Sequence, residues 1–243
     1  MIAANKESVG ELVAENLARA QVFEKHHIDY CCQGQRTLEE VCHEQGLRVD
    51  TLVSELDSAP ADDNAGTWAS VSLTELADHI IERHHTYLRS ALPSIAEKLD
   101  NVIEAHSDRH GGFLLRLRKI VRGLGQELTQ HMMKEELMLF PLIRQMEAAE
   151  RAGIAPPAAP GGSINNPICM MVHEHDTAGR ALDEMHTLTG GYVPPSDACN
   201  TFRALYAALM ELESDLHMHI HLENNILFPR AAELEARPDS GAP

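Results

Sequence analysis

The chain has 243 residues, and its 20 Lys and Arg against 37 Asp and Glu give a formal net charge of −17. This balance argues against a nucleic-acid partner, because phosphate contacts need a basic surface. An apolar share of 44% argues against wholesale disorder, and no apolar run approaches the roughly 20 residues that cross a bilayer. The first residues lack the pattern of a secretory signal, so we expect a cytoplasmic protein without a membrane partner.

Residues 1–58 are predicted to form a small helical module. A first helix is expected over residues 10–25. Thr37 and Glu40 have the spacing of a capping box, which predicts the start of a short second helix, and Gly46 is placed to end it. Residues 59–71 are predicted to be a linker, because their first part is polar, contains Pro and Gly and has no periodicity.

Residues 72–235 carry four long helical patterns and no strand signal, so the predicted class is all-α and the predicted architecture a four-helix bundle. Pro141 and Pro229 lie near helix ends and are expected to kink or terminate the helices there. The four helices are expected over about 72–110, 112–149, 166–189 and from about 196 onward.

Each of these helices has an apolar stripe with alternating spacings of three and four residues, which is typical of a bundle interior. Polar residues interrupt the stripes at six places, and all six are histidine or glutamate. They are His85, His131, Glu135, His175, His219 and Glu223. A single histidine on such a stripe is more often a hydrogen-bonded core residue. Two buried glutamates without partners are costly, however, and a shared cation removes that cost.

The six residues also form a repeated unit. His131 and Glu135 are four residues apart, as are His219 and Glu223, so each pair lies on one helix face. Both pairs are followed at the same offset by Leu-Phe-Pro, which indicates two equivalent helical hairpins. Glu174 is interpreted either as a base or proton carrier beside the ligands or as a plain surface acid. Other polar neighbours lie off the stripes and are expected to face solvent or the next helix: His84, Glu136, His173, His217 and His221.

The ligand types narrow the choice of metal. A single zinc takes three or four ligands, and magnesium and calcium prefer oxygen throughout. Mixed imidazole and carboxylate ligation in a bundle core favours iron or manganese, and often a pair of them. Two six-coordinate metals offer about twelve positions, of which four imidazoles, two bridging carboxylates and one oxo or hydroxo bridge fill about ten. We therefore predict a di-iron centre with room for a small ligand on each metal.

With these motifs the sequence resembles the Repair of Iron Centres family (RIC, ScdA-type) of iron–sulfur cluster repair proteins, within the hemerythrin-like superfamily. The matching segments are Asp29-Tyr30-Cys31-Cys32, His131-Met132-Met133-Lys134-Glu135-Glu136, Glu174-His175-Asp176, and His219-Ile220-His221-Leu222-Glu223-Asn224-Asn225. The resemblance implies a hemerythrin-like bundle with an N-terminal ScdA-type domain. It also implies the same six ligands, with Glu135 and Glu223 as bridges.

The resemblance further implies a role in restoring iron–sulfur clusters damaged by nitrosative or oxidative stress. Damaged iron–sulfur proteins would be the partners, and iron delivery or nitric oxide reduction would be the activity, so enzymatic turnover is left open. Two other functions are considered. One is a hemerythrin-like protein that binds or senses dioxygen or nitric oxide. The other is a binding module whose iron only signals to the N-terminal domain.

The adjacent cysteines, Cys31 and Cys32, are a second candidate site. Their Cα atoms are about 3.8 Å apart, which is too close for an ordinary structural disulfide between them. The two thiols are interpreted as a pair that holds iron in transfer, exchanges disulfides with a partner, or bridges two chains in a homodimer. The alternative is a buried pair of small apolar residues. The three remaining cysteines are taken as packing residues: Cys42, Cys169 and Cys199.

Overall fold

The structure is a computed structural model that describes residues 7–60 and 67–237. Within these ranges the regular structure is helical, apart from one isolated β-bridge between Ser8 and Thr37, which confirms the predicted all-α class. No helix in the described ranges is both long enough and apolar enough to cross a membrane. The chain divides into two compact units. One consists of Met1–Ala77, Ile143–Ile164 and His217–Pro243, and the other of Asp78–Leu142 and Asn165–Leu216.

The first unit begins with five short helical segments. They are α1 (Val9–Glu15), η1 (Leu17–Arg19), α2 (Ala20–Lys25), α3 (Leu38–Gln45) and α4 (Val49–Asp57). The predicted single helix over 10–25 is wrong, because Asn16 interrupts it with an extended backbone (φ −152°). The Asn16 side chain accepts a hydrogen bond from the N–H of Ala18 at 3.1 Å and so caps a new turn instead of continuing the first. The predicted capping box is confirmed, and α3 ends at Gly46 in the left-handed region (φ 68°).

The first unit also contains six short segments that precede or follow the longer helices, each of them wholly or largely within the unit. They are α5 (Thr67–Ser70), α6 (Leu73–His79), α8 (Phe140–Ala152), η4 (Pro160–Gly162), η5 (Glu223–Leu227) and α11 (Phe228–Ala236). Glu147 on α8 holds the start of α6: its carboxylate accepts from the N–H of Leu73 at 2.7 Å and from the hydroxyl of Thr74 at 2.6 Å. Residues 61–66 of the predicted linker lie outside the described residues.

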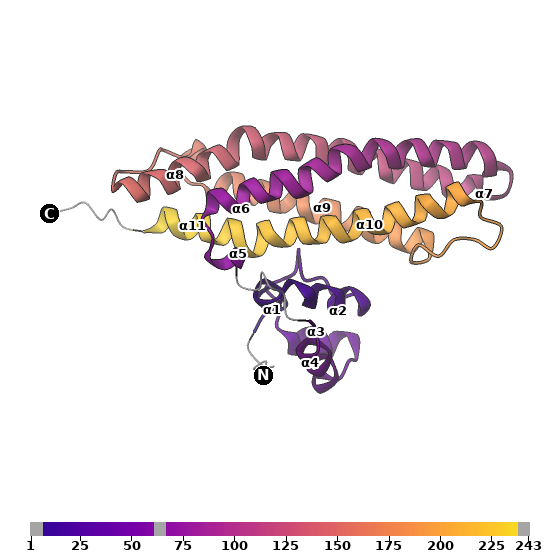
Figure 1. Cartoon of the computed structure of the whole chain (residues 1–243), viewed down its shortest axis with the longest axis horizontal. Helices are drawn as coiled ribbons and strands as arrows, with labels where there is room; N and C mark the ends of the chain where they lie inside the picture. Colours follow the sequence, from indigo (N-terminus) through magenta and orange to yellow (C-terminus); the bar gives the residue numbers. More distant parts are fainter. Residues whose placement is uncertain (1–6, 61–66, 238–243) are drawn as a thin grey trace. The chain divides into compact units, whose positions relative to one another are not determined.

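The second unit contains the long helical segments. They are η2 (Ile80–His85), α7 (Thr86–Lys134), η3 (Glu135–Leu139), α9 (Asn165–Thr189) and α10 (Asn200–Leu222), of which the last six residues belong to the first unit. The two halves of α7 lie side by side, because the carboxylate of Asp100 and the guanidinium of Arg122 are 2.8 Å apart. In a straight helix these residues would be about 33 Å apart. The chain therefore reverses near Gly111 and Gly112, at the predicted boundary between the first two bundle helices, although the helical backbone is not interrupted there. The halves of α7 with α9 and α10 form the predicted four-helix bundle (Figure 1).

The helix ends differ in detail from the prediction. Helix α9 begins at Asn165, one residue before its expected start, and ends at Thr189 as predicted, where the chain turns at Gly190 (φ 62°). Helix α10 begins at Asn200 rather than near 196, because residues 196–197 form a turn first. Pro141 and Pro229 do not terminate their helices. Each is the second residue of a helix, α8 or α11, that follows a π-helical turn.

Three π-helical turns interrupt the regular helices: η2, η3 and η5. In η3 and η5 the closing hydrogen bond runs over five residues, from the N–H of Phe140 to the carbonyl of Glu135 and from the N–H of Phe228 to the carbonyl of Glu223. The residue after each phenylalanine is a proline, which has no N–H to donate to the preceding turn. A wide turn before the proline lets the helix continue. Such turns are frequent at functional sites.

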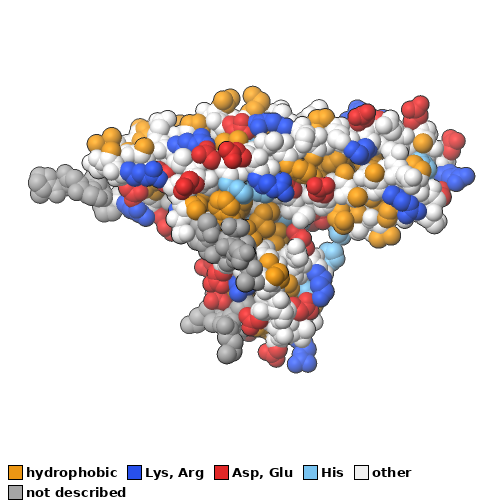
Figure 2. Space-filling model, viewed as in Figure 1, with side chains coloured by type: hydrophobic (Ala, Val, Ile, Leu, Met, Phe, Trp, Pro, Cys, Tyr) orange, Lys and Arg blue, Asp and Glu red, His pale blue; other side chains and the backbone are white. Residues whose placement is uncertain are grey.

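The bundle stripes are buried largely as the periodicity predicts. The stripe predicted for α9 is buried at all six positions: Ile168, Met171, His175, Ala178, Leu182 and Met185. The stripe predicted for the fourth helix is buried at all seven: Leu205, Leu209, Leu212, Leu216, His219, Glu223 and Ile226. The spacing of the second stripe also places Met138 inside, after Glu135, but Met138 is 59% exposed, because the π-helical turn η3 rotates Leu139 inward in its place. His84 and His221, expected off the stripes, are buried. On the outside, acidic and basic side chains are interspersed over the face drawn in Figure 2.

Candidate metal centre

Four of the predicted ligands lie together in the second unit. His85 ends the π-helical turn η2, His131 and Glu135 lie one turn apart where α7 passes into η3, and His175 lies in the middle of α9. All four are at most 2% exposed. Glu135 lies between two imidazoles, with one oxygen 3.3 Å from Nε2 of His85 and the other 3.2 Å from Nε2 of His131. Nε2 of His131 is in turn 3.0 Å from Nε2 of His175.

The first unit supplies the other two predicted ligands, which repeat this local pattern. His219 near the end of α10 and Glu223 at the start of η5 are one turn apart and almost fully buried. Nε2 of His219 lies 3.1 Å from a carboxylate oxygen of Glu223. The His-x-x-x-Glu spacing therefore places an imidazole and a carboxylate against each other at both occurrences in the chain.

Three of the ligands in the second unit form a close cluster. One nitrogen or oxygen atom of each of His131, Glu135 and His175 lies within 4.8 Å of those of the other two. His85 approaches the other oxygen of Glu135, so this carboxylate has an imidazole at each of its two oxygens.

Carboxylates also hold the outer nitrogens of two histidines. Nδ1 of His85 is 2.6 Å from Glu136, and Nδ1 of His131 is 2.9 Å from Glu174. With Nδ1–H donating to a carboxylate, the imidazole presents the lone pair of Nε2 to the interior, which is the usual arrangement around a bound metal. Glu136, expected to face solvent or the next helix, faces the neighbouring helix, where it contacts His85 and Arg89. Glu174, for which the sequence left two interpretations open, hydrogen-bonds one of the predicted ligands.

Each of these carboxylates is paired with a cation at its outer side. Glu136 also binds the guanidinium of Arg89, and Glu174 binds the ammonium of Lys134. Partial burial raises the pKa of Glu174, but the hydrogen bonds from Lys134 and His131 outweigh it, and the pKa falls below its usual range. The same balance, with hydrogen bonds from His85 and Arg89, lowers the pKa of Glu136. Both groups are therefore carboxylates at neutral pH.

The residues present fit a bound cation. Both oxygens of Glu135 are buried, and neither accepts a hydrogen bond from any described residue. A buried carboxylate left in that state is costly unless a cation sits against it. Imidazoles beside a carboxylate are nitrogen and oxygen donors in the mixture that iron and manganese accept, whereas magnesium and calcium take oxygen alone.

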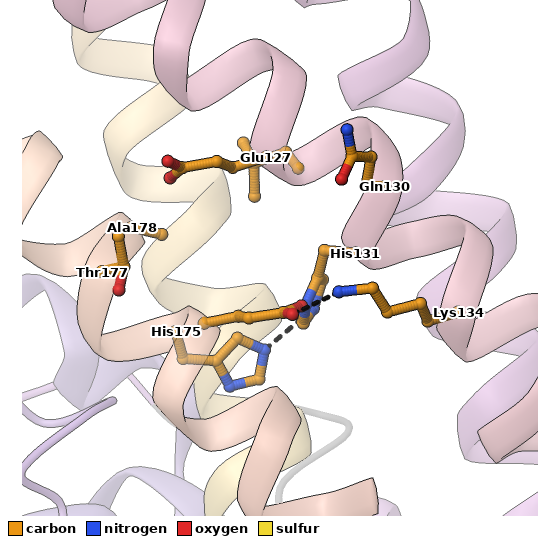
Figure 3. A pocket seen from close by; sticks show the side chains of 9 residues that line it. Glu127, Gln130, His131, Lys134, His175, Thr177 and Ala178 are labelled. Carbon is orange, nitrogen blue, oxygen red and sulfur yellow. Dashed lines mark hydrogen bonds and ion pairs between the residues drawn. The ribbon is translucent and has the colours of Figure 1, made fainter.

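A pocket opens onto one side of these residues. It has a volume of about 240 Å³ and is lined by residues of α7 and α9, including His131 and His175. Figure 3 shows Glu127, Gln130 and Lys134 on the α7 side of this pocket and Thr177 and Ala178 on the α9 side. The two histidines form its floor, so this face of the site is accessible to a small molecule or ion.

The second predicted site, the cysteine turn, lies in the first unit. Cys31 and Cys32 do not form a disulfide: their sulfurs are 3.7 Å apart, and Asp29 accepts hydrogen bonds from both backbone N–H groups, at 3.0 and 2.8 Å. A hydrogen bond with Cys32 and burial raise the pKa of Cys31 well above its usual range, so this thiol is protonated at neutral pH. Sulfur and carboxylate atoms of the three residues lie within 4.8 Å of one another.

The cysteine turn contacts the segment that carries Glu223. The side-chain amide of Asn225 donates to the carbonyls of Tyr30 and Cys31, at 3.2 Å each, and Asn224 also donates to Cys31. The ring of His221 lies edge-on to Tyr30, with centroids 5.6 Å apart. Burial lowers the pKa of His221 to about 4, against a smaller opposing effect of the Tyr30 carbonyl, so this residue is a neutral packing partner of the module.

Two features of the site were missed by sequence reasoning. The first is the π-helical turns that begin or end at His85, Glu135 and Glu223. For the two glutamates the sequence held one indication of such a turn, the proline six residues later. The second is the contact of Asn225 with the module, of which the sequence held no indication that a periodicity could reveal. Among the other cysteines, Cys42 is buried as expected, but Cys169 and Cys199 are exposed and do not pack in the core.

Comparison with known proteins agrees with this arrangement. Residues 5–60 match the ScdA_N domain, a domain of unknown function (DUF542), and residues 76–231 match the hemerythrin HHE cation binding domain. The iron–sulfur cluster repair protein YtfE of Musicola paradisiaca (strain Ech703) is 38% identical over 95% of this chain and 98% of its own. The protein of the same name from Escherichia coli O81 (strain ED1a) is 37% identical over 92% of this chain and 95% of its own. The chain therefore belongs to the YtfE-type family, in which an ScdA_N domain precedes a hemerythrin HHE cation binding domain.

Proposed function

We propose that this protein is a di-iron protein that repairs iron–sulfur clusters damaged by nitrosative or oxidative stress in the cytoplasm. The observation that carries the proposal is the buried carboxylate of Glu135, which has His85 at one oxygen and His131 at the other, and the same His-x-x-x-Glu contact at His219 and Glu223. A carboxylate with an imidazole at each oxygen suits a bridge between two adjacent iron ions, and Glu223 would supply the second bridge. Six residues would hold them: His85, His131, Glu135, His175, His219 and Glu223.

The names of the relatives support the repair function. Several YtfE proteins that cover nearly the whole chain are called iron–sulfur cluster repair proteins. The partners would accordingly be proteins whose iron–sulfur clusters have lost iron. Residues 1–58 would act as the module that meets them, residues 59–71 as the linker, and residues 72–235 as the iron-bearing bundle.

Bound iron would supply redox electrons, positions for a small ligand such as nitric oxide or dioxygen, and a store of the metal that a damaged cluster lacks. The chain's own residues have separate tasks. Glu136 and Glu174 hold the Nδ1–H of His85 and His131 and so fix the rings toward the interior. The apolar bundle excludes water from the buried carboxylates.

Cys31 and Cys32 are the proposed transfer residues. Their turn carries two thiols and the carboxylate of Asp29 within 4.8 Å of one another, which is a donor set able to hold iron briefly. Cys32 is partly accessible whereas Cys31 is buried, so Cys32 would meet an incoming partner first.

The first test is the metal content and optical spectrum of protein purified without chelator. We expect about two irons per chain, with an oxo-to-iron charge-transfer band if the bridge between them is an oxo group. A single zinc, or fully folded protein without metal, would contradict the di-iron proposal. A repair assay then follows, in which a dehydratase inactivated by nitric oxide is incubated with the iron-loaded protein and its recovered activity is measured.

A Cys31→Ser/Cys32→Ser variant separates repair from ligand sensing. Under the proposal the variant keeps the di-iron spectrum and loses repair. Full repair by the variant would remove the cysteines from the transfer step. Reversible binding of dioxygen or nitric oxide, with no recovery of a damaged cluster by the unsubstituted protein, would favour the alternative of a hemerythrin-like binding or sensing protein.

A further inference from the structure

The two histidine pairs of the proposed centre have unequal surroundings. His131 and His175 form the floor of the pocket between the second half of α7 and α9 (Figure 3). His85 is fully buried, and its ring stacks on Phe140 with centroids 5.9 Å apart. A larger cavity of about 760 Å³ lies near Arg89 between the halves of α7, but none of the six proposed ligands lines it.

An ion pair lies among the residues that line the small pocket. The ammonium of Lys134 binds one oxygen of Glu174, whose other oxygen lies 2.9 Å from Nδ1 of His131. The Lys134 side chain is 37% exposed and lines the pocket. A cation that leaves or enters through this pocket must pass the positive charge of Lys134, which repels the cation. Because Lys134 is paired with Glu174, it also keeps that carboxylate from binding the cation.

We propose that the iron held by His131 and His175 is the exchangeable one, that it passes through this pocket, and that Lys134 is the gate. The inference rests on the proposed function, because the metal that passes is the iron cargo of the bundle. The iron held by His85 would be retained, because Phe140 covers that imidazole and none of the pockets described above reaches it. Glu127, on the same face of α7 as His131, would receive the departing ion at the pocket wall.

The structure supplies a matched pair of variants. Lys134→Gln removes the charge at the pocket and leaves the contact between Glu174 and His131 in place. Arg89→Gln removes the equivalent cation from Glu136, beside His85, which lines neither of the two cavities named above. Lys119→Gln removes one positive charge from an exposed position of α7 outside the pocket and controls for net charge. Lys134→Arg keeps the charge.

The test measures iron release from the loaded protein to the ferrous chelator ferrozine by absorbance, after dithionite reduction. We expect two phases of equal amplitude in the unsubstituted protein. Lys134→Gln should speed the fast phase about threefold to fivefold, the range expected for losing one partly exposed ion pair. The slow phase should not change, and Lys134→Arg, Arg89→Gln and Lys119→Gln should match the unsubstituted protein in both phases.

Salt provides a second readout that does not depend on folding of a variant. At 1 M salt the Debye length falls to about 3 Å, so the gate charge is screened and the fast phase of the unsubstituted protein should approach that of Lys134→Gln. A single release phase from protein loaded with two irons, or equal acceleration by Lys134→Gln and Arg89→Gln, would overturn the gate and leave the di-iron proposal standing. Failure to load two irons would overturn both.

Discussion

The side-chain amide of Asn225 lies 3.2 Å from the backbone carbonyl of Cys31 and donates a hydrogen bond to it. Two glycines make this contact possible. A Cβ on Gly10 would lie 2.6 Å from the Asn225 amide oxygen, and a Cβ on Gly34 would lie 2.7 Å from the carbonyl of Tyr30 and closer still to Asn225. Asn225 is two residues after Glu223, so one π-helical turn carries both a proposed iron ligand and the hydrogen bonds that hold the cysteine turn.

Gly34→Ala should destabilise the protein by about 2 kcal/mol or more, because the added methyl group meets backbone and the Asn225 amide in a packed site. Gly123→Ala is the matched control, since nothing lies within 4 Å of a Cβ there and the residue is inside helix α7. That change should stabilise by up to about 1 kcal/mol. Urea unfolding of both variants gives the comparison. Equal effects of the two changes on stability would mean that the close approach of Asn225 to Gly34 has no role.

Asn225→Ala should increase the reactivity of the cysteine turn, because two hydrogen bonds to its backbone are lost and Cys31 becomes accessible. The measurement is the rate of thiol labelling by an aromatic disulfide reagent. It is best made in a Cys169→Ser/Cys199→Ser background, because those two thiols are exposed and would dominate the signal. Unchanged labelling in Asn225→Ala would show that other contacts hold the turn.

Glu135→Ala and Glu223→Ala should each lower the iron content and the stability of the loaded protein more than His221→Ala does. Each glutamate lies against the buried imidazole one turn before it, whereas His221 packs against Tyr30. His221→Ala leaves a cavity in a fully buried site and should itself cost some stability. Iron content is therefore the sharper measurement. Equal iron losses in all three variants would contradict the ligand assignment.

Glu174→Gln and Glu136→Gln should each weaken iron binding about 10-fold to 100-fold, the usual cost of losing the carboxylate that orients a ligating histidine. The glutamine oxygen can still accept from Nδ1, so the fold should be kept. Competition with a chelator of known affinity measures the loss. His173→Gln, an exposed change beside Glu174, should leave the affinity unaltered.

Glu147 should make the protein sensitive to acid. Partial burial raises its pKa, but hydrogen bonds from Thr74 and from the N–H of Leu73 outweigh this and lower the pKa below its ordinary value. A carboxyl with a lowered pKa in the folded state stabilises the protein above the unfolded pKa of about 4.3, and the stabilisation is lost as the pH falls toward the folded value. Glu147→Gln should therefore cost about 1 kcal/mol at neutral pH. It should also flatten the stability curve below about pH 4.5 in denaturant titrations.

The periodic parts of the fold could be predicted because helix geometry repeats every 3.6 residues. The stripes located His85, His131, His175 and His219 on the buried faces, and spacing alone put each glutamate one turn from its histidine. The ScdA_N and hemerythrin matches support the resemblance that those motifs indicated.

Departures from regular helix could not be predicted in the same way. The π-helical turn η3 adds a residue to one turn, so the stripe loses its register and Met138 faces outward where regular spacing puts it inside. Asn16 interrupts a helix whose composition favours continuity, because its side chain competes for the backbone N–H of Ala18. The competing groups are close in the sequence, but whether the side chain or the helix binds the N–H depends on how the surrounding residues pack.

The sequence by itself determined the helical class, the module and bundle, and the six polar positions on apolar stripes, since each depends on residue types at fixed local spacing. Only the tertiary structure decided which carboxylates hold the histidine rings, which imidazoles line a pocket, and that Asn225 reaches the cysteine turn. Glu136 and Glu174 have the same role but lie on different helical segments, and each contacts a histidine at least 43 residues away in the chain. Contacts over such separations depend on how helices pack, and no repeat in the sequence encodes them.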